Sequence, residues 1–184
     1  LIGRNGAGKT TFMRAVMGLI ARMDGHIAFG DDDLTGLPAH RRAGLGIGYM
    51  PEDRKLVPEF TAEENVLLPA WSTGMGDARD RLEWVYGLMP EVANFRDRRA
   101  NQLSGGQQKL VALARALLCG NRMLLLDEPF EGVAPALAQR LAQIIARLKD
   151  EGMPVLIADS NEQHVRDLIE RTFLIERGSV EVRG

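Results

Sequence analysis

A glycine-rich run near the start of the chain has the residue types and the spacing of a polyphosphate-binding loop. The run from Gly3 to Thr10, with the sequence GRNGAGKT, fits the pattern G-x-x-x-x-G-K-[ST]. Glycines let backbone N–H groups turn inward around phosphate oxygens, and the helix that follows adds its positive N-terminal end. A glycine turn that only caps a helix is the alternative. The run also lies between an expected strand end and an expected helix, which favours the phosphate loop.

Two side chains of this run can do chemistry on a nucleotide. Lys9 would reach the β- and γ-phosphates, and the Thr10 hydroxyl would hold Mg²⁺. The residues expected to contact the nucleotide in this run are Gly3, Arg4, Asn5, Gly6, Ala7, Gly8, Lys9, Thr10 and Thr11.

Two acidic residues follow an apolar run in the last third of the chain. The run from Leu124 to Leu126 predicts a buried strand, and Asp127 and Glu128 come at its carboxyl end, where ligands bind in open α/β folds. We expect Asp127 to complete the Mg²⁺ shell and Glu128 to accept a proton from the attacking water, a step worth about 10²- to 10⁴-fold. Alone, the pattern also fits a solvated strand end. Together with the phosphate loop it predicts hydrolysis of a nucleoside triphosphate.

A third motif, with the sequence LSGGQ, spans Leu103 to Gln107. With it the chain resembles the ATP-binding subunits of ABC transporters, which carry this signature. The order and spacing of the phosphate loop, the helical region, the signature and the Asp-Glu strand also match that family, and the resemblance covers essentially all of the sequence. The resemblance implies that the signature closes over ATP held by a second ABC ATP-binding subunit, at a helix N-terminus that favours an anion. The implied contacts are Leu103, Ser104, Gly105, Gly106 and Gln107. A simple helix cap with flexible glycines is the alternative interpretation.

The resemblance carries further expectations. It implies a P-loop NTPase of the ABC ATPase type, an α/β fold with a mainly parallel sheet flanked by helices and an inserted helical subdomain. It implies ATP and Mg²⁺ as cofactors, ATP hydrolysis coupled to transport, and a peripheral position on the cytoplasmic face of the cell (inner) membrane. The implied partners are integral membrane permease subunits and, indirectly, a periplasmic or extracellular solute-binding protein. The segments 49–54 and 128–135 are similar to those of subunits that serve import of branched-chain or other hydrophobic amino acids, while related members handle urea or short amides.

Three residues depart from the general family pattern. Glu52 stands where a glutamine normally follows a strand; we expect this carboxylate among the nucleotide and metal contacts, with a spacer acid in a mobile loop as the alternative. Ser160 occupies the position of the switch histidine, and we group it with Lys9 and Glu128 as catalytic although it cannot be cationic. Ala134 stands where an aspartate usually helps couple two sites. One site of a pair would then hydrolyse slowly or depend on its partner.

The expected elements place these motifs in one domain. Apolar spacing predicts helices over 9–22, 38–43, 77–88, 104–118, 135–149 and 162–169, and strands over 26–29, 47–50, 123–126, 154–158, 172–175 and 180–182. Thr61 and Glu64 form a capping box for another helix, and 31–33 reads as a solvated turn. We expect a single ABC ATP-binding domain over 1–184, with a catalytic α/β core over 1–60 and 119–184 and a helical subdomain over 61–118.

Composition limits the other function classes. The net charge of the 184 residues is -2, so binding of nucleic acid by bulk charge is not expected. The single cysteine excludes an internal disulfide, and no apolar run reaches the roughly 18 residues of a membrane span. The first two residues look like the end of a strand, so we expect an N-terminally truncated fragment that lacks the aromatic residue on which adenine stacks in the family.

The sequence also fits two rival functions. A soluble ABC-type ATPase that acts without a membrane partner is one rival, and a weakly hydrolysing, ATP-gated regulatory subunit is another. Trp71 and Trp84 lie in the helical region, where such subunits dock the membrane partner, and each is either a partly buried core residue or a docking contact. The basic residues at 40–42 and 98–99 read as solvated faces.

Overall fold

Three parallel strands form the central sheet of the computed structural model, which describes residues 1–20, 24–161, 163–164 and 166–183. The sheet has the order β3 (Ile47–Met50), β4 (Met123–Asp127) and β5 (Val155–Ala158). Ile2 extends it beyond β5 through parallel bridges to Asp159 and Leu174. The expected α/β class with a mainly parallel sheet is confirmed.

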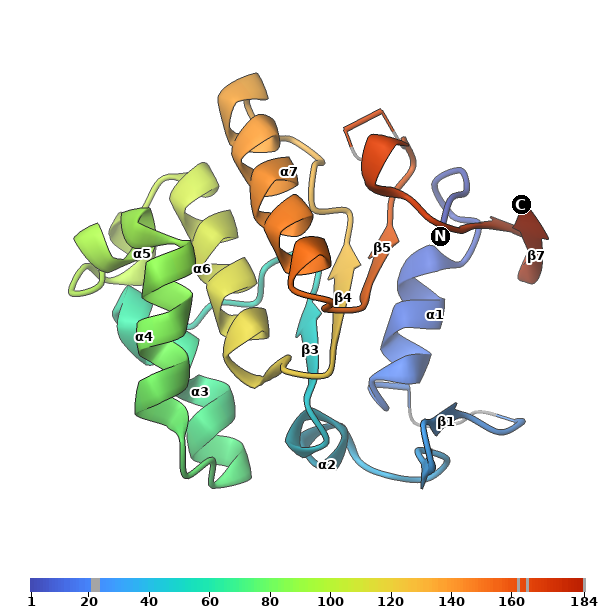
Figure 1. The fold of residues 1–184 in the computed structure, drawn as a ribbon, viewed down its shortest axis with the longest axis horizontal. Coiled ribbons are helices and arrows are strands. Elements are labelled where there is room, and N and C mark those ends of the chain that lie inside the picture. Colours follow the sequence, from blue (N-terminus) through green and yellow to red (C-terminus); the bar gives the residue numbers. More distant parts are fainter. Residues whose placement is uncertain (21–23, 162, 165, 184) are drawn as a thin grey trace.

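The central strand β4 is buried on both faces because helices cover both sides of the sheet (Figure 1). Leu124 and Leu126 pack in a core with α6 (Gly105–Cys119) and α7 (Pro135–Asp150). Leu125, which points the other way, packs in a second core beside α1 (Lys9–Val16). A continuous apolar run in the sequence of β4 is typical of such a strand.

Four helices gather on the side of the sheet that carries β3, at the opposite end of the molecule from α1 (Figure 1). They are α3 (Ala62–Thr73), α4 (Ala78–Leu88), α5 (Pro90–Asn94) and α6. The remaining elements are α2 (Ala39–Gly44), the 3-10 turns η1 (Ala100–Gln102) and η2 (Arg166–Leu168), the antiparallel pair β1 (Ala28–Phe29) and β2 (Asp32–Asp33), and the antiparallel pair β6 (Thr172–Glu176) and β7 (Ser179–Arg183).

The caps that the sequence predicts in the helical region are confirmed. The Thr61 hydroxyl accepts from the Glu64 N–H at 3.1 Å, and the Glu64 carboxylate accepts from the Thr61 N–H at 2.7 Å. Ser104 caps α6 in the same way through Gln107. Such reciprocal caps satisfy backbone donors that a helix start leaves unpaired.

The first helix is shorter than predicted, and the reason lies in two residues. Gly18 has a left-handed φ of 68°, the conformation that ends many helices. The buried Arg42 guanidinium donates to the carbonyls of Ala15 at 2.9 Å and Val16 at 2.6 Å, so it caps the last turn of α1. The helix therefore ends at Val16, and positions 21–23 of the predicted segment lie outside the described residues. The expectation that 40–42 is a solvated face is wrong for Arg42.

Two further expectations need correction. Over 162–169 the structure has only the short turn η2, and positions 162 and 165 lie outside the described residues. Asp32 and Asp33 are not a free turn: they pair with β1 across a tight connection in which Gly30 has a φ of 59°. A left-handed glycine favours a tight hairpin connection. Within the described residues, no helix has the length and apolar character needed to cross a bilayer.

Candidate active site

The glycine-rich run forms an open loop at the carboxyl end of the sheet, directly before α1. Gly6 and Gly8 have φ values of 82° and 112°, which residues with a side chain rarely adopt. Gly8 is the N-cap residue of α1. At Gly3 a Cβ atom would lie 2.5 Å from the carbonyl oxygen of Ile175 in β6, so only glycine fits. The loop thus follows from its glycines, and it aims the start of α1 at the space above the sheet.

A cavity of about 290 Å³ lies over this loop. It brings together residues from the loop, from the segment after β3 and from the turn after β4. Its lining is Asn5, Gly6, Gly8, Lys9, Thr10, Thr11, Glu52, Glu128 and Glu131. Glu131 is absent from the sequence expectations, although it stands three residues after Glu128 on the same turn. Arg4 and Ala7 belong to the loop, which they close through a 3.0 Å hydrogen bond from the Ala7 N–H to the Arg4 carbonyl.

Lys9 and Glu128 form a buried ion pair in this cavity. Their charged atoms are 2.9 Å apart, and the side chains are 5% and 7% exposed. Lys9 also donates to the Gly3 carbonyl at 2.8 Å. The second carboxylate oxygen of Glu128 accepts from the N–H and the hydroxyl of Ser160 at 3.2 and 3.4 Å. Ser160 therefore reaches Glu128 directly, a contact that the sequence did not indicate.

Asp127 lies beside Thr10 at the end of β4. The Thr10 hydroxyl donates to one oxygen of Asp127 at 3.2 Å, and the Tyr49 hydroxyl donates to the other at 3.3 Å. Burial raises the pKa of Asp127. Burial also raises the pKa of Tyr49, with the nearby Asp127 carboxylate as a further cause. Tyr49 was not among the predicted site residues; its place on β3, opposite Leu125 in the register, brings it here.

These donors suit Mg²⁺ bound together with phosphates. Mg²⁺ is usually held by one or two carboxylates plus substrate phosphates and water rather than by a cage of side chains. Asp127 and the Thr10 hydroxyl offer such a partial set. Across the part of the chain that the structure describes, no cluster of three or more His, Cys, Asp or Glu residues could hold a metal by itself. Glu52 is the third expected ligand. Its pKa is raised, mainly by partial burial and next by the neighbouring Glu131 carboxylate.

The signature segment lies outside this cavity. Of the described residues that line the cavity, none belongs to 103–107. Ser104 and Gly105 are exposed at the start of α6, and a Cβ atom on Gly106 would lie 3.0 Å from a Leu137 methyl group. Within one chain the signature segment and the phosphate loop therefore do not share this cavity.

A family profile described as "ABC transporter" matches residues 1–131. The chain belongs to the ABC transporter family. The lipopolysaccharide export system ATP-binding protein LptB of Escherichia coli K12 is 36% identical over 186 residues, spanning 100% of this chain and 77% of LptB. The branched-chain amino acid transport ATP-binding protein BraG of Pseudomonas aeruginosa is 33% identical, spanning 98% of this chain and 77% of BraG.

Solved structures agree with this membership. An ATP-binding cassette of an ABC transporter in its ADP conformation has a TM-score of 0.80 and 27% identity, covering 98% of this chain and 76% of that cassette. A dimeric cassette in a post-hydrolysis state with ADP and Pi has a TM-score of 0.84 and 26% identity, covering 100% and 84%. The chain is thus an ABC-type, ATP-binding ATPase subunit of a transporter, and the expected P-loop NTPase fold of this type is confirmed.

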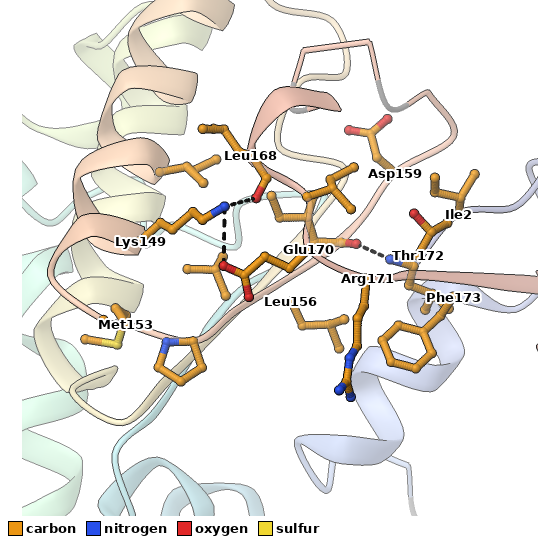
Figure 2. A pocket seen from close by; sticks show the side chains of 17 residues that line it. Ile2, Lys149, Met153, Leu156, Asp159, Leu168, Glu170, Arg171, Thr172 and Phe173 are labelled. Atoms are coloured by element: carbon orange, nitrogen blue, oxygen red, sulfur yellow. Dashed lines mark hydrogen bonds and ion pairs between the residues drawn. The ribbon is translucent and has the colours of Figure 1, made fainter. Parts of the chain in front are cut away.

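Two further cavities lined by described residues of this ABC ATPase are larger than the one over the phosphate loop. One, of about 450 Å³, lies between β5, β6 and the end of α7, and Figure 2 shows its mainly apolar lining around Leu156 and Phe173. Of the described residues that line it, none belongs to the phosphate loop, although Leu1 and Ile2 lie directly before that loop. The other, of about 840 Å³, lies between α1, α2, β3 and α3, and reaches Glu52 and Asp127. This cavity therefore adjoins the candidate active site, with which it shares Thr10 and Glu52.

The two tryptophans of this ABC ATPase differ in how far they are exposed. Trp84 packs against the main core, with the Arg81 guanidinium 4.3 Å from its ring centroid. Trp71 is 56% exposed and rests edge-on against Phe60 near the end of α3. Trp71 alone of the pair is free to meet a partner.

Asp159 is a buried acid beside Glu128. It is 6% exposed, its Oδ1 accepts from the Asn161 N–H at 2.9 Å, and within the described residues its Oδ2 has no hydrogen-bond partner. Burial, with the Glu128 carboxylate as a further cause, raises the pKa of Asp159 to about 6. Asp159 therefore adds a titrating group beside the Glu128 carboxylate.

Asp159→Asn is expected to change how stability depends on pH. A raised pKa means that the folded state holds the proton more tightly, so the contribution of Asp159 to stability is present below about pH 4 and is lost as the pH rises through about 6. Asparagine does not titrate, so the variant should gain about 1–3 kcal/mol relative to wild type between pH 4 and pH 7.5. Denaturant unfolding at both pH values checks this. Parallel pH curves for the two proteins would contradict it.

Proposed function

We propose that this chain is the ATP-hydrolysing motor subunit of a transporter that imports branched-chain or related amino acids. The observation that supports ATP hydrolysis is that the phosphate loop, Glu52 and Glu128 line one cavity, of about 290 Å³. The loop offers N–H groups and Lys9 to the phosphates, and Asp127 and Thr10 would hold Mg²⁺, which supplies charge neutralisation at the phosphates.

In this proposal Glu128 is the general base. Its carboxylate is paired with Lys9, and bound ATP would take over the ammonium, leaving Glu128 to face the γ-phosphate and a water. Ser160 keeps the carboxylate in place through its N–H and hydroxyl. Most of the rate would come from positioning and charge stabilisation, since phosphoryl transfer needs little covalent chemistry from the protein.

The proposed working unit contains two such subunits. Because Ser104 and Gly105 are exposed and the segment 103–107 lies outside the cavity that the described residues form, a second ABC ATP-binding subunit would supply this segment across the nucleotide. We retain the division into a catalytic core over 1–60 and 119–184 and a helical subdomain over 61–118. The helical subdomain then carries the signature toward the partner's phosphates.

We place the membrane permease against the 840 Å³ cavity and the exposed Trp71. The cavity offers apolar surface from Met17, Leu68 and Pro69 and opens toward Glu52, so an inserted element of the permease would sense the nucleotide site. The subunit would lie on the cytoplasmic face of the cell membrane, and a solute-binding protein would act on the other side through the permease.

The cargo is tested by reconstitution. The purified protein with its co-purifying permease, placed in proteoliposomes with the solute-binding protein, is expected to take up leucine, isoleucine or valine in an ATP-dependent manner, with turnover stimulated by the permease. The named relatives include both BraG and LptB. ATP-dependent extraction of lipopolysaccharide without amino acid uptake would contradict the proposed cargo, and a soluble partner alone would contradict the proposed permease.

A second candidate function is a weakly hydrolysing, regulatory half of an unequal pair. It is favoured by Ser160, which offers no positive charge to a γ-phosphate, by the acid at Glu52 and by Ala134. ATP binding without turnover, both alone and with the permease, would support this candidate over the motor.

A further inference from the structure

The signature helix α6 reaches the turn that carries Glu128 through one buried lysine. Lys109 is 3% exposed and lies on the second turn of α6. Its ammonium donates to the carbonyl of Glu128 at 3.0 Å and to the carbonyl of Glu131 at 2.7 Å. Both bonds go to the main chain, so this contact fixes the path of the turn.

The main chain of Glu128 needs such support. Its φ of 47° is left-handed, a conformation that is costly for a residue with a side chain, and Pro129 follows it. Two anchors hold it from opposite sides. The Glu128 N–H donates to the Ala158 carbonyl in β5 at 2.7 Å, and the Glu128 carbonyl accepts from Lys109. Removing the second anchor would let this residue relax, and its carboxylate would move with it.

The same helix also holds the other loop beside the cavity. Arg54 donates to the Gln108 side chain at 3.1 Å, and Arg115 donates to the carbonyls of Arg54 and Lys55. Loop 51–55, which presents Glu52, is thus tied to α6, as is the turn that presents Glu128. The helix that begins at the signature is therefore the common support of the loop that presents Glu52 and of the turn that presents Glu128 and Glu131.

We propose that Lys109 is a positioning residue for hydrolysis, which fixes the main chain of Glu128 from the signature helix so that the carboxylate can face the γ-phosphate. The inference rests on the proposed function, because it takes Glu128 as the base. It concerns geometry at the reacting water and not affinity for ATP, since Lys109 lies under the turn and does not line the cavity formed by the described residues.

Lys109→Met tests the proposal, because methionine keeps an unbranched side chain and removes the N–H donors. We expect kcat for ATP hydrolysis to fall about 10- to 100-fold, the cost of a small displacement of a reacting group. The KM for ATP should stay close to wild type. The unfolding temperature should fall only modestly, because the variant loses two hydrogen bonds but no longer buries a charge. Amide hydrogen exchange over 128–134 should become faster, and Lys109→Arg, which restores donors, should recover part of kcat.

Lys149→Met is the matched control. Lys149 also donates to a main-chain carbonyl, that of Leu168 at 3.0 Å, and it pairs with Glu170, but it lies beside the 450 Å³ cavity (Figure 2). This variant should keep the wild-type kcat.

Glu128→Gln, measured alongside, separates the two proposals. If Glu128→Gln keeps the wild-type kcat, the proposed base is wrong and the inference falls with it. If Glu128→Gln is inactive while Lys109→Met keeps kcat, only the positioning role is wrong. A Lys109→Met protein that loses kcat, ATP affinity and unfolding temperature together would show a purely structural residue and would also overturn the inference.

Discussion

Lys9→Ala is expected to abolish ATP binding and to destabilise the nucleotide-free protein at the same time. The ammonium is the one side-chain cation in the lining of the candidate site over the described residues, and charge-assisted hydrogen bonds are worth about 1.5–3 kcal/mol each. Lys9 would donate one such bond to each of the β- and γ-phosphates, and losing both lowers the affinity for ATP by about 100-fold or more. Equilibrium binding of a fluorescent ATP analogue measures this loss.

The stability effect has a separate cause. Lys9→Ala leaves the Glu128 carboxylate buried without its cation, and breaking a buried ion pair from one side costs about 3–5 kcal/mol. The double variant Lys9→Ala/Glu128→Gln should recover much of the stability, because the unpaired charge is gone, but none of the ATP binding. Arg147→Ala, which breaks an exposed ion pair with Glu151, serves as the control and should shift stability by less than about 1 kcal/mol. A Lys9→Ala protein of wild-type stability would contradict the buried ion pair.

Local motifs are the part of this site that the sequence predicts well. The phosphate loop depends on Gly6, Gly8 and Lys9 within a few residues of one another, and Asp127 follows directly from a strand that is apolar throughout. Each of these features is set by spacing along the chain. The capping boxes at Thr61 and Ser104 are short-range in the same sense, and all of these elements lie where they were predicted.

Contacts between distant segments are the part that the sequence does not predict. The ion pair of Lys9 with Glu128, and the bonds of Ser160 and Lys109 to Glu128, join residues from four elements that meet only in the folded sheet. Arg42 illustrates the same limit. Its charge suggested a solvated face, but tertiary packing buries it as the cap of α1, and this cap together with Gly18 shortens the helix.

The most direct test of the central claim is ATP turnover by Glu128→Gln compared with wild type, with the protein alone and with its detergent-solubilised permease. The variant should bind ATP at least as tightly as wild type, because glutamine no longer competes as an anion for Lys9. Its turnover should fall about 10²- to 10⁴-fold, the usual worth of a general base. Wild-type turnover should depend on Glu128 and rise with the permease. Wild-type turnover by Glu128→Gln would contradict the assignment of Glu128 as the base.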